Sequence, residues 1–94
     1  MRVVWTPVAL ARLDEIIDYT AQDSPTAAYR VAKEITTRAE ATLSGSPFAG
    51  RVGLSNTREF VLHTIPYIVI YQVTQDVEIL DIWHTSRQWP ERFG

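Results

Sequence analysis

The chain has 94 residues, of which 46% are hydrophobic and 21% charged, with a formal net charge of −2. This length and composition indicate one folded domain over residues 1–94 and exclude a disordered chain. The absence of cysteine excludes disulfides, thiol nucleophiles and thiolate metal sites. Proteins that bind a nucleic-acid backbone are usually basic, because contacts with phosphates dominate their affinity; this chain is net acidic. No apolar run approaches the roughly 20 residues of a membrane span, so we expect a cytoplasmic protein.

The chain opens with a predicted strand that leads directly into a helix. Residues 2–5 are mostly β-branched and aromatic, which is typical of a short strand. Thr6 then provides an N-cap, and Pro7 occupies the first helical position, where its missing N–H costs nothing. Apolar residues recur at helical spacing from there to about Gln22, which predicts a helix with one buried face.

A second helix is predicted immediately after the first. Ser24 and Pro25 repeat the cap and proline signal, and a second apolar stripe extends to about Leu43. Alanine is frequent along this stripe, which lets two helices approach closely. Because the link between the two helices is so short, they form an antiparallel hairpin.

The second half of the chain predicts three strands. The first lies within residues 57–63, and the second, Tyr67–Val73, is a nearly continuous apolar run typical of a central strand. Strict alternation in the third, residues 77–84, places one set of side chains on each face: Val77, Ile79 and Trp83 on one, Glu78, Leu80, Ile82 and His84 on the other. The order is therefore β-α-α-β-β-β, an α+β fold whose antiparallel sheet is packed on one face by the helical hairpin.

Polar and aromatic residues gather at the end of the last predicted strand, where functional groups commonly lie. The group consists of Trp83, His84, Arg87 and Trp89. It predicts a patch that faces a phosphate or a partner protein. A structural alternative stays open, in which His84 bonds a backbone carbonyl, Arg87 pairs with Glu59 or Asp81, and the tryptophans close the core.

Two further residues are candidates for contacts with a partner. Arg58 precedes the apolar part of its strand and could reach a carboxylate of the fold or of a partner. Tyr71 lies on the predicted central strand, although tyrosine there is more often a core residue with a satisfied hydroxyl. The two histidines lack metal-ligand spacing and no glycine-rich phosphate loop is present, so we expect no metal and no cofactor.

An ordered series of motifs resembles the ParE-type toxins of the RelE/ParE superfamily. The series comprises Trp5-Thr6-Pro7, Ser24-Pro25, Gly50-Arg51, Thr57-Arg58-Glu59, Pro66-Tyr67-Ile68-Val69-Ile70-Tyr71, His84, Arg87 and Trp89-Pro90. The resemblance extends from about Val3 to Pro90 and agrees with the element order predicted above. It implies the toxin half of a type II toxin–antitoxin pair, which forms a hetero-oligomer with a cognate antitoxin.

The resemblance implies one of two activities. RelE-like members are ribosome-dependent mRNA endonucleases, whereas ParE-like members inhibit DNA gyrase. RelE-type ribonucleases tend to carry an arginine after the central-strand tyrosine and lysines on the strand before it, where this chain has Ile68, Glu59 and Val61. The loss of one preorganised cationic donor already costs roughly 3–4 kcal/mol of barrier. We therefore predict a gyrase inhibitor without catalytic residues and without direct sequence-specific binding to nucleic acid.

Two alternatives remain beside the gyrase inhibitor. In a RelE-like endonuclease, His84 and Arg87 would be the catalytic residues, because a histidine near the last strand can act as acid or base. A non-toxic interaction module would share the same sequence features. For the preferred function we expect five partner-binding residues on or near one concave face: Arg58, Tyr71, His84, Arg87 and Trp89.

Overall fold

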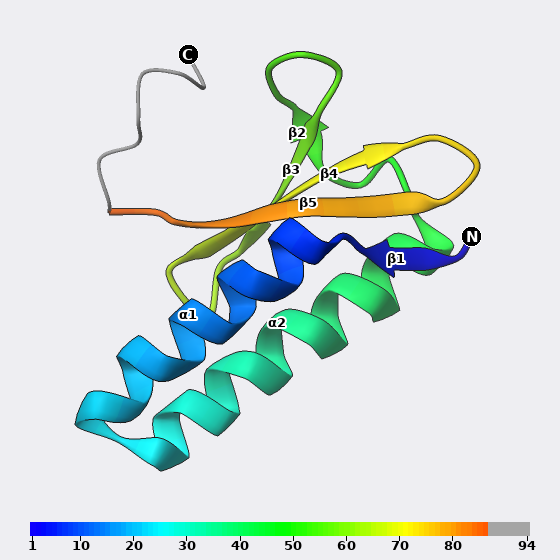
Figure 1. Cartoon of the computed structure of the whole chain (residues 1–94). Helices are drawn as coiled ribbons and strands as arrows, with labels where there is room; N and C mark the ends of the chain where they lie inside the picture. Colours follow the sequence, from blue (N-terminus) through cyan, green and yellow to red (C-terminus); the bar gives the residue numbers. More distant parts are fainter. Residues whose placement is uncertain (87–94) are drawn as a thin grey trace.

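The computed structural model describes residues 1–86, in which two helices lie against one face of a five-stranded sheet (Figure 1). In chain order the elements are β1 (Val3–Trp5), α1 (Pro7–Asp23), α2 (Pro25–Gly45), β2 (Arg51–Val52), β3 (Arg58–Leu62), β4 (Tyr67–Val73) and β5 (Val77–His84). Their order across the sheet is β1-β5-β4-β3-β2, so β4 is the central strand, as its sequence predicts. The predicted site residues Arg87 and Trp89 lie outside the described residues.

Both predicted helix starts are confirmed. The hydroxyl of Thr6 accepts from the Ala9 N–H at 3.3 Å and donates to the Ile79 carbonyl at 2.7 Å, which ties the start of α1 to β5. The hydroxyl of Ser24 accepts from the Ala27 N–H at 3.1 Å and caps α2 in the same way. A proline follows each cap within the first turn. Helix α2 runs two residues beyond its predicted end, to Gly45.

The α+β class and the hairpin on one face are confirmed, but the sheet is mixed rather than wholly antiparallel. Strand β1 pairs in parallel with β5, in the register Val3 to Val77. Parallel pairing needs a long crossover connection, which here contains the helical hairpin and the remaining strands. The sequence also does not predict β2, because two residues are too few to show an alternating pattern.

The core lies between the sheet and the two helices. From the helices come Ala9, Leu13, Ile16, Ile35, Ala39 and Leu43, and from the strands Leu62, Tyr67, Val69, Tyr71, Val77, Ile79 and Ile82. Ala28 and Ala39 of α2 are almost fully and fully buried, which brings this helix close to its neighbours. Phe60 packs against the same cluster as Leu62, so these two side chains of β3 face the core.

A β-bulge in β5 changes which residues face the core. Ile70 pairs with Asp81 and Tyr71 pairs with Ile79, so Leu80 has no residue opposite it on β4. One extra residue shifts the alternation by one position, and the predicted faces of β5 are therefore wrong beyond Leu80. Ile82 and His84 join the inward face, while Asp81 and Trp83 turn to the face away from the core.

Candidate functional site

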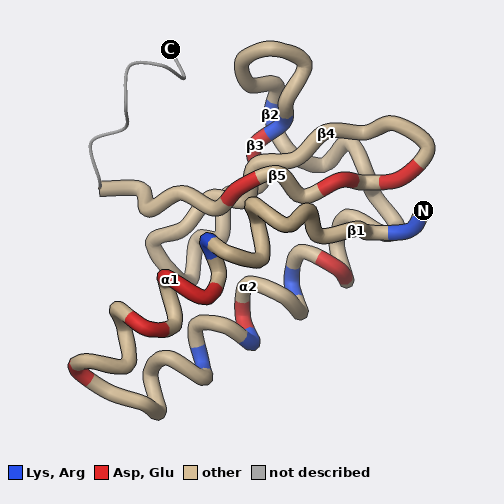
Figure 2. The backbone as a smooth tube through the Cα atoms, viewed as in Figure 1, with Lys and Arg blue, Asp and Glu red and all other residues tan. Residues whose placement is uncertain are grey.

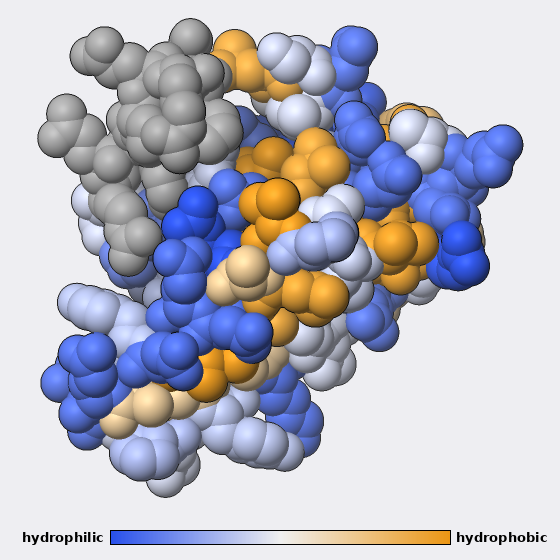
Figure 3. Space-filling model, viewed as in Figure 1, coloured by the Kyte–Doolittle hydropathy of each residue, from blue (hydrophilic) through white to orange (hydrophobic). Residues whose placement is uncertain are grey.

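A groove of about 360 Å³ lies on the sheet face away from the core. We call it the outer-face groove, and it is lined by Val8, Arg12, Leu54, Ser55, Thr57, Glu59, Ile70, Leu80, Asp81 and Trp83. Apolar side chains gather here over β5, between the start of α1 and the β2–β3 hairpin (Figure 3). Val8 and Leu54 are more than half exposed and lie in the same groove, where contiguous apolar surface is accessible to a partner.

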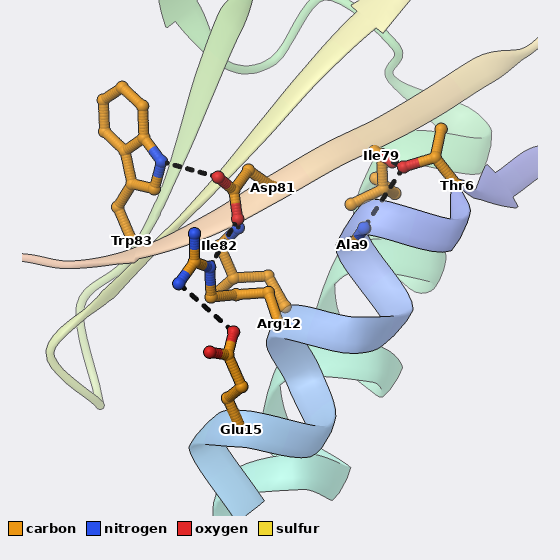
Figure 4. A network of polar contacts seen from close by, with 8 residues as sticks. All are labelled: Thr6, Ala9, Arg12, Glu15, Ile79, Asp81, Ile82 and Trp83. Carbon is orange, nitrogen blue, oxygen red and sulfur yellow. Dashed lines mark hydrogen bonds and ion pairs between the residues drawn. The ribbon is translucent and has the colours of Figure 1, made fainter. Parts of the chain in front are cut away.

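The bulge places Asp81 at the centre of a polar network beside the groove (Figure 4). One oxygen of Asp81 accepts from Arg12 Nε at 2.9 Å and from the Ile82 N–H at 2.8 Å. Its other oxygen accepts from the Trp83 indole N–H at 3.1 Å. Asp81 is therefore a buried carboxylate whose charge is balanced, and it fixes the positions of Arg12 and Trp83 in the groove wall.

The ionisable groups of the groove are held in ion pairs. The hydrogen bond that Arg12 donates to Asp81 is the main cause that raises the pKa of Arg12, and it outweighs the opposite effect of burial. Arg12 also lies 3.3 Å from a Glu15 oxygen, one turn along α1. Glu59, on the opposite wall, is paired with Arg51, whose Nε lies 2.8 Å away and which does not line the groove. Because these charges compensate one another, the groove presents mainly apolar surface.

The two carboxylates that sequence reasoning offered Arg87 are Asp81 and Glu59, and each has an arginine partner within residues 1–86. Arg87 itself lies outside the described residues, so its pairing stays a prediction. Sequence reasoning missed Arg12 as a site residue. The sequence signal that could have pointed to Arg12 is Asp81, the single acid in an otherwise apolar stretch of β5. A buried carboxylate needs a cation nearby.

Two predicted partner residues, Arg58 and Tyr71, instead converge on the loop before β2. They are opposite one another on β3 and β4. The Tyr71 hydroxyl accepts from the Gly50 N–H at 2.8 Å, and Arg58 donates to the Gly50 carbonyl at 2.8 Å. The Arg58 guanidinium also lies 4.9 Å from the centre of the Phe48 ring, in a cation–π contact.

Tyr71 has no exposed surface to offer a partner. Its side chain is fully buried, and this burial raises the pKa of its hydroxyl, an effect that the Gly50 N–H and the charge of Arg58 partly oppose. Tyr71 therefore acts as a core residue that positions the loop. Arg58 is half-buried in this arrangement, so its role toward a partner stays a prediction.

His84 lies at the end of β5 with its ring edge against Tyr67, at 5.1 Å between ring centres. Its Nδ1 lies 3.1 Å from the Ser86 backbone N–H and 2.9 Å from the Ser86 hydroxyl. Because a backbone N–H only donates, Nδ1 carries the lone pair and the neutral ring holds its proton on Nε2. The histidine is thus anchored to the turn that follows β5.

Within residues 1–86 the structure brings together only part of the predicted set. Arg58 and Tyr71 meet at Gly50, whereas His84 lies at the other end of the sheet, paired with the opposite end of β4. No group of three or more histidine or acidic side chains in these residues could hold a metal ion. In the same part of the chain, neither helix has the length and apolar character needed to cross a membrane.

Comparison with known proteins identifies the family. The family described as the ParE toxin of type II toxin–antitoxin system, parDE, matches residues 3–89. The chain is 48% identical over 91 residues to "Putative toxin Y4kP" of Sinorhizobium fredii, covering 96% of this chain and 94% of that protein. It is 41% identical over 87 residues to Toxin RelE2 of Caulobacter vibrioides, covering 92% and 97%.

A solved structure agrees with this assignment. The chromosomal ParDE toxin–antitoxin system from P. aeruginosa contains a chain that superposes with a TM-score of 0.80 at 26% identity, covering 92% of this chain and 97% of that one. A TM-score of 0.80 over most of both chains shows that they share the overall fold. The chain belongs to the ParE toxin family of type II toxin–antitoxin systems.

Proposed function

We propose that this toxin arrests DNA replication in the cytoplasm by inhibiting DNA gyrase, and that a cognate antitoxin binds and neutralises it. One observation carries the choice of target: the outer-face groove presents apolar side chains, and its ionisable groups are held in ion pairs. Such a surface suits contacts with another protein, since interfaces combine an apolar centre with a polar rim.

The same face is poorly suited to cleaving RNA. A phosphodiester cleavage passes through an anionic transition state, which needs cations and a proton acceptor directed at it. Among the residues that the structure describes, Arg12 is the only cation that lines the groove, and two carboxylates, Asp81 and Glu15, compensate it. The Nδ1 lone pair of His84, which would accept a proton, is already engaged by Ser86.

A ribosome-dependent mRNA endonuclease remains the second candidate. It is favoured by the 41% identity to a protein named Toxin RelE2 and by the location of half-exposed His84 near the chain's C-terminal end. In that mechanism His84 would transfer a proton and Arg87 would stabilise the phosphate. The two candidates differ in whether His84 is needed for toxicity.

The deciding experiment measures both processes in the same cells. DNA and protein synthesis are followed by pulse labelling with thymidine and methionine just after the chain is induced without a partner. An early fall in thymidine incorporation, together with inhibition of purified gyrase in a supercoiling assay, supports the proposal. An early fall in methionine incorporation with unaffected supercoiling would replace it by the endonuclease.

A further inference from the structure

Trp83 is the largest side chain in the wall of the outer-face groove. Among the groove-lining residues that the structure describes, it is the only aromatic one. It lies on β5 opposite Ile68 of the central strand β4, so its backbone is paired with the centre of the sheet. In protein interfaces a few residues contribute most of the binding energy, and tryptophan is enriched among them because it offers a large, rigid apolar surface.

The orientation of the Trp83 indole is fixed from inside the protein. Its N–H donates to one oxygen of Asp81 at 3.1 Å, and the other oxygen accepts from Arg12 on α1 at 2.9 Å. Figure 4 shows Asp81 between the other two side chains. Asp81 and Trp83 are two positions apart on one strand and therefore share a face of the sheet. Since the N–H is the only polar group of an indole, the rest of the ring is apolar surface.

This arrangement lowers the entropy that Trp83 would lose on binding a partner. A side chain that rotates in the unbound protein has to be immobilised in an interface, at a cost in affinity. Asp81 is held by Arg12 and by the Ile82 N–H, and it immobilises the indole beforehand. The affinity of the groove should therefore depend on Arg12 through the position of Trp83.

The charges around Trp83 favour a protein over a nucleic acid as its partner. Bases do stack on aromatic rings in proteins that bind single strands, but there a positively charged groove follows the phosphates. Here the carboxylates of Asp81 and Glu59 line the groove beside one cation, Arg12, in the part of the chain that the structure describes. The acidic residues of β3 and β5 are red in Figure 2. This wall would repel phosphates, whereas it accepts an apolar side chain of a protein.

We infer that Trp83 anchors the toxin to gyrase, with an apolar side chain of gyrase packed on its indole, and that Asp81 and Arg12 are positioning residues that hold the indole for this contact. The inference rests on the proposed function and adds to it the side chain that makes the central contact. The apolar groove residues Val8 and Leu54 surround this contact and exclude water from it.

The first test measures inhibition of gyrase supercoiling by the full chain and its variants. Trp83→Ala should raise the concentration for half-inhibition by about thirtyfold or more, as expected of a residue that contributes much of the binding energy. Trp83→Phe keeps a ring but loses the N–H that orients it, and should raise this concentration by about three- to tenfold. Far-UV circular dichroism and urea denaturation establish that each variant is folded.

The matched control is a second tryptophan with the same kind of hydrogen bond. The Trp5 indole N–H donates to a carboxylate oxygen of Glu40 at 3.2 Å, but Trp5 lies on β1 and does not line the groove. Trp5→Phe should therefore inhibit gyrase like the unaltered toxin. Equal effects of the two phenylalanine variants would show that loss of an indole hydrogen bond acts through general stability, which would overturn the role of Trp83.

The positioning role of Arg12 has its own test. Arg12→Gln should raise the concentration for half-inhibition by about fivefold, because Asp81 loses its charged donor. Arg12→Lys keeps a charged donor beside Asp81 and should inhibit better than the glutamine variant. Arg2→Gln removes another ion-paired arginine, which is 76% exposed and precedes β1, and should have no effect. Equal losses in the glutamine and lysine variants, or no loss in either, would overturn the positioning role.

A further measurement uses the unaltered chain and does not depend on whether a variant folds. Oxidation of Trp83 by hydroxyl radicals, read by mass spectrometry, should fall severalfold when gyrase is added, while oxidation of Trp5 stays the same. Unchanged oxidation of Trp83, or unchanged inhibition by Trp83→Ala, would overturn the inference and leave the proposed function in place. Protection of Trp83 by a single-stranded oligonucleotide instead of gyrase would make nucleic acid the partner. If the unaltered toxin does not inhibit supercoiling, the proposed function itself fails, and the inference with it.

Discussion

The Tyr71 hydroxyl accepts a hydrogen bond from the backbone N–H of Gly50 at 2.8 Å, deep inside the molecule. The contact ties the central strand to the loop that leads into β2, twenty-one positions earlier in the chain. Since Arg58 holds the carbonyl of the same glycine, both backbone groups of Gly50 are satisfied. The position of β2, and with it one wall of the outer-face groove, therefore depends on this buried contact.

The first prediction concerns the space at Gly50. A Cβ added there would lie 2.7 Å from the Tyr71 hydroxyl and ring, and 2.9 Å from the Glu59 carbonyl oxygen. We expect Gly50→Ala to lower the free energy of unfolding by about 1–3 kcal/mol, because the backbone at Glu59 cannot give way cheaply. Urea denaturation measures this change. Gly45→Ala is the control: nothing lies within 4 Å of its added Cβ, so it should be neutral or slightly stabilising.

The second prediction concerns alkaline pH. Burial raises the pKa of Tyr71 in the folded chain above its ordinary value of 10.0, so the unfolded chain loses this proton first as pH rises. The stability linked to Tyr71 is therefore complete below about pH 10 and is lost as the pH rises through the folded pKa. Urea midpoints between pH 8 and 11 should fall, and less steeply in Tyr71→Phe. Equal slopes in the two proteins would contradict the prediction.

The third prediction concerns the Arg12–Asp81 pair. Asp81 is only 7% exposed and accepts three hydrogen bonds, one of them from a charged donor. Asp81→Asn should lower the free energy of unfolding by about 2 kcal/mol, because hydrogen bonds that involve a charged group contribute about 1.5–3 kcal/mol. A double-mutant cycle with Arg12→Gln should give a coupling of about 1–2 kcal/mol. Additive effects of the two substitutions would show that the contact contributes little.

Local signals in the sequence predict most of the fold. The Thr6-Pro7 and Ser24-Pro25 pairs mark both helix starts, because the cap hydroxyl accepts from an N–H of the first turn and the proline lies within that same turn. The run Tyr67–Val73 is correctly assigned as the central strand because its first five residues, all apolar or aromatic, are buried. Interactions between distant residues are not predictable in this way. The parallel pairing of β1 with β5 joins positions 74 residues apart, and no local pattern records it.

The site was harder to predict for the same physical reason. Leucine is an ordinary residue type for a strand, so nothing in the sequence marks Leu80 as the extra residue of a bulge. That bulge nevertheless turns Asp81 out of the core. Without the bulge, alternation would direct a carboxylate between the helices and the sheet, at a prohibitive desolvation cost. Tyr71 was predicted as a candidate for contact with a partner, with a core position as the commoner alternative, and the Gly50 N–H that satisfies its hydroxyl is not visible in the sequence.

The fourth prediction uses His84 to separate the two proposed activities. Inhibition of gyrase does not need His84 to transfer a proton, so folded His84→Ala should arrest growth as the unaltered toxin does. A loss of toxicity by several orders of magnitude, with urea stability unchanged, would favour an endonuclease that uses His84 as acid or base. Far-UV circular dichroism and urea denaturation establish that the variant is folded.

The last prediction tests the outer-face groove as the surface that contacts the target. Leu54 is 55% exposed on the groove wall, so Leu54→Asp should preserve folding but place a charge among apolar side chains. We expect at least a tenfold higher toxin concentration for half-inhibition of gyrase supercoiling, and growth without arrest. The matched control is Leu10→Asp on α1, a leucine 49% exposed but outside the groove, which should act like the unaltered toxin. If both aspartates weaken inhibition equally, added negative charge accounts for the effect; if neither does, the target binds elsewhere.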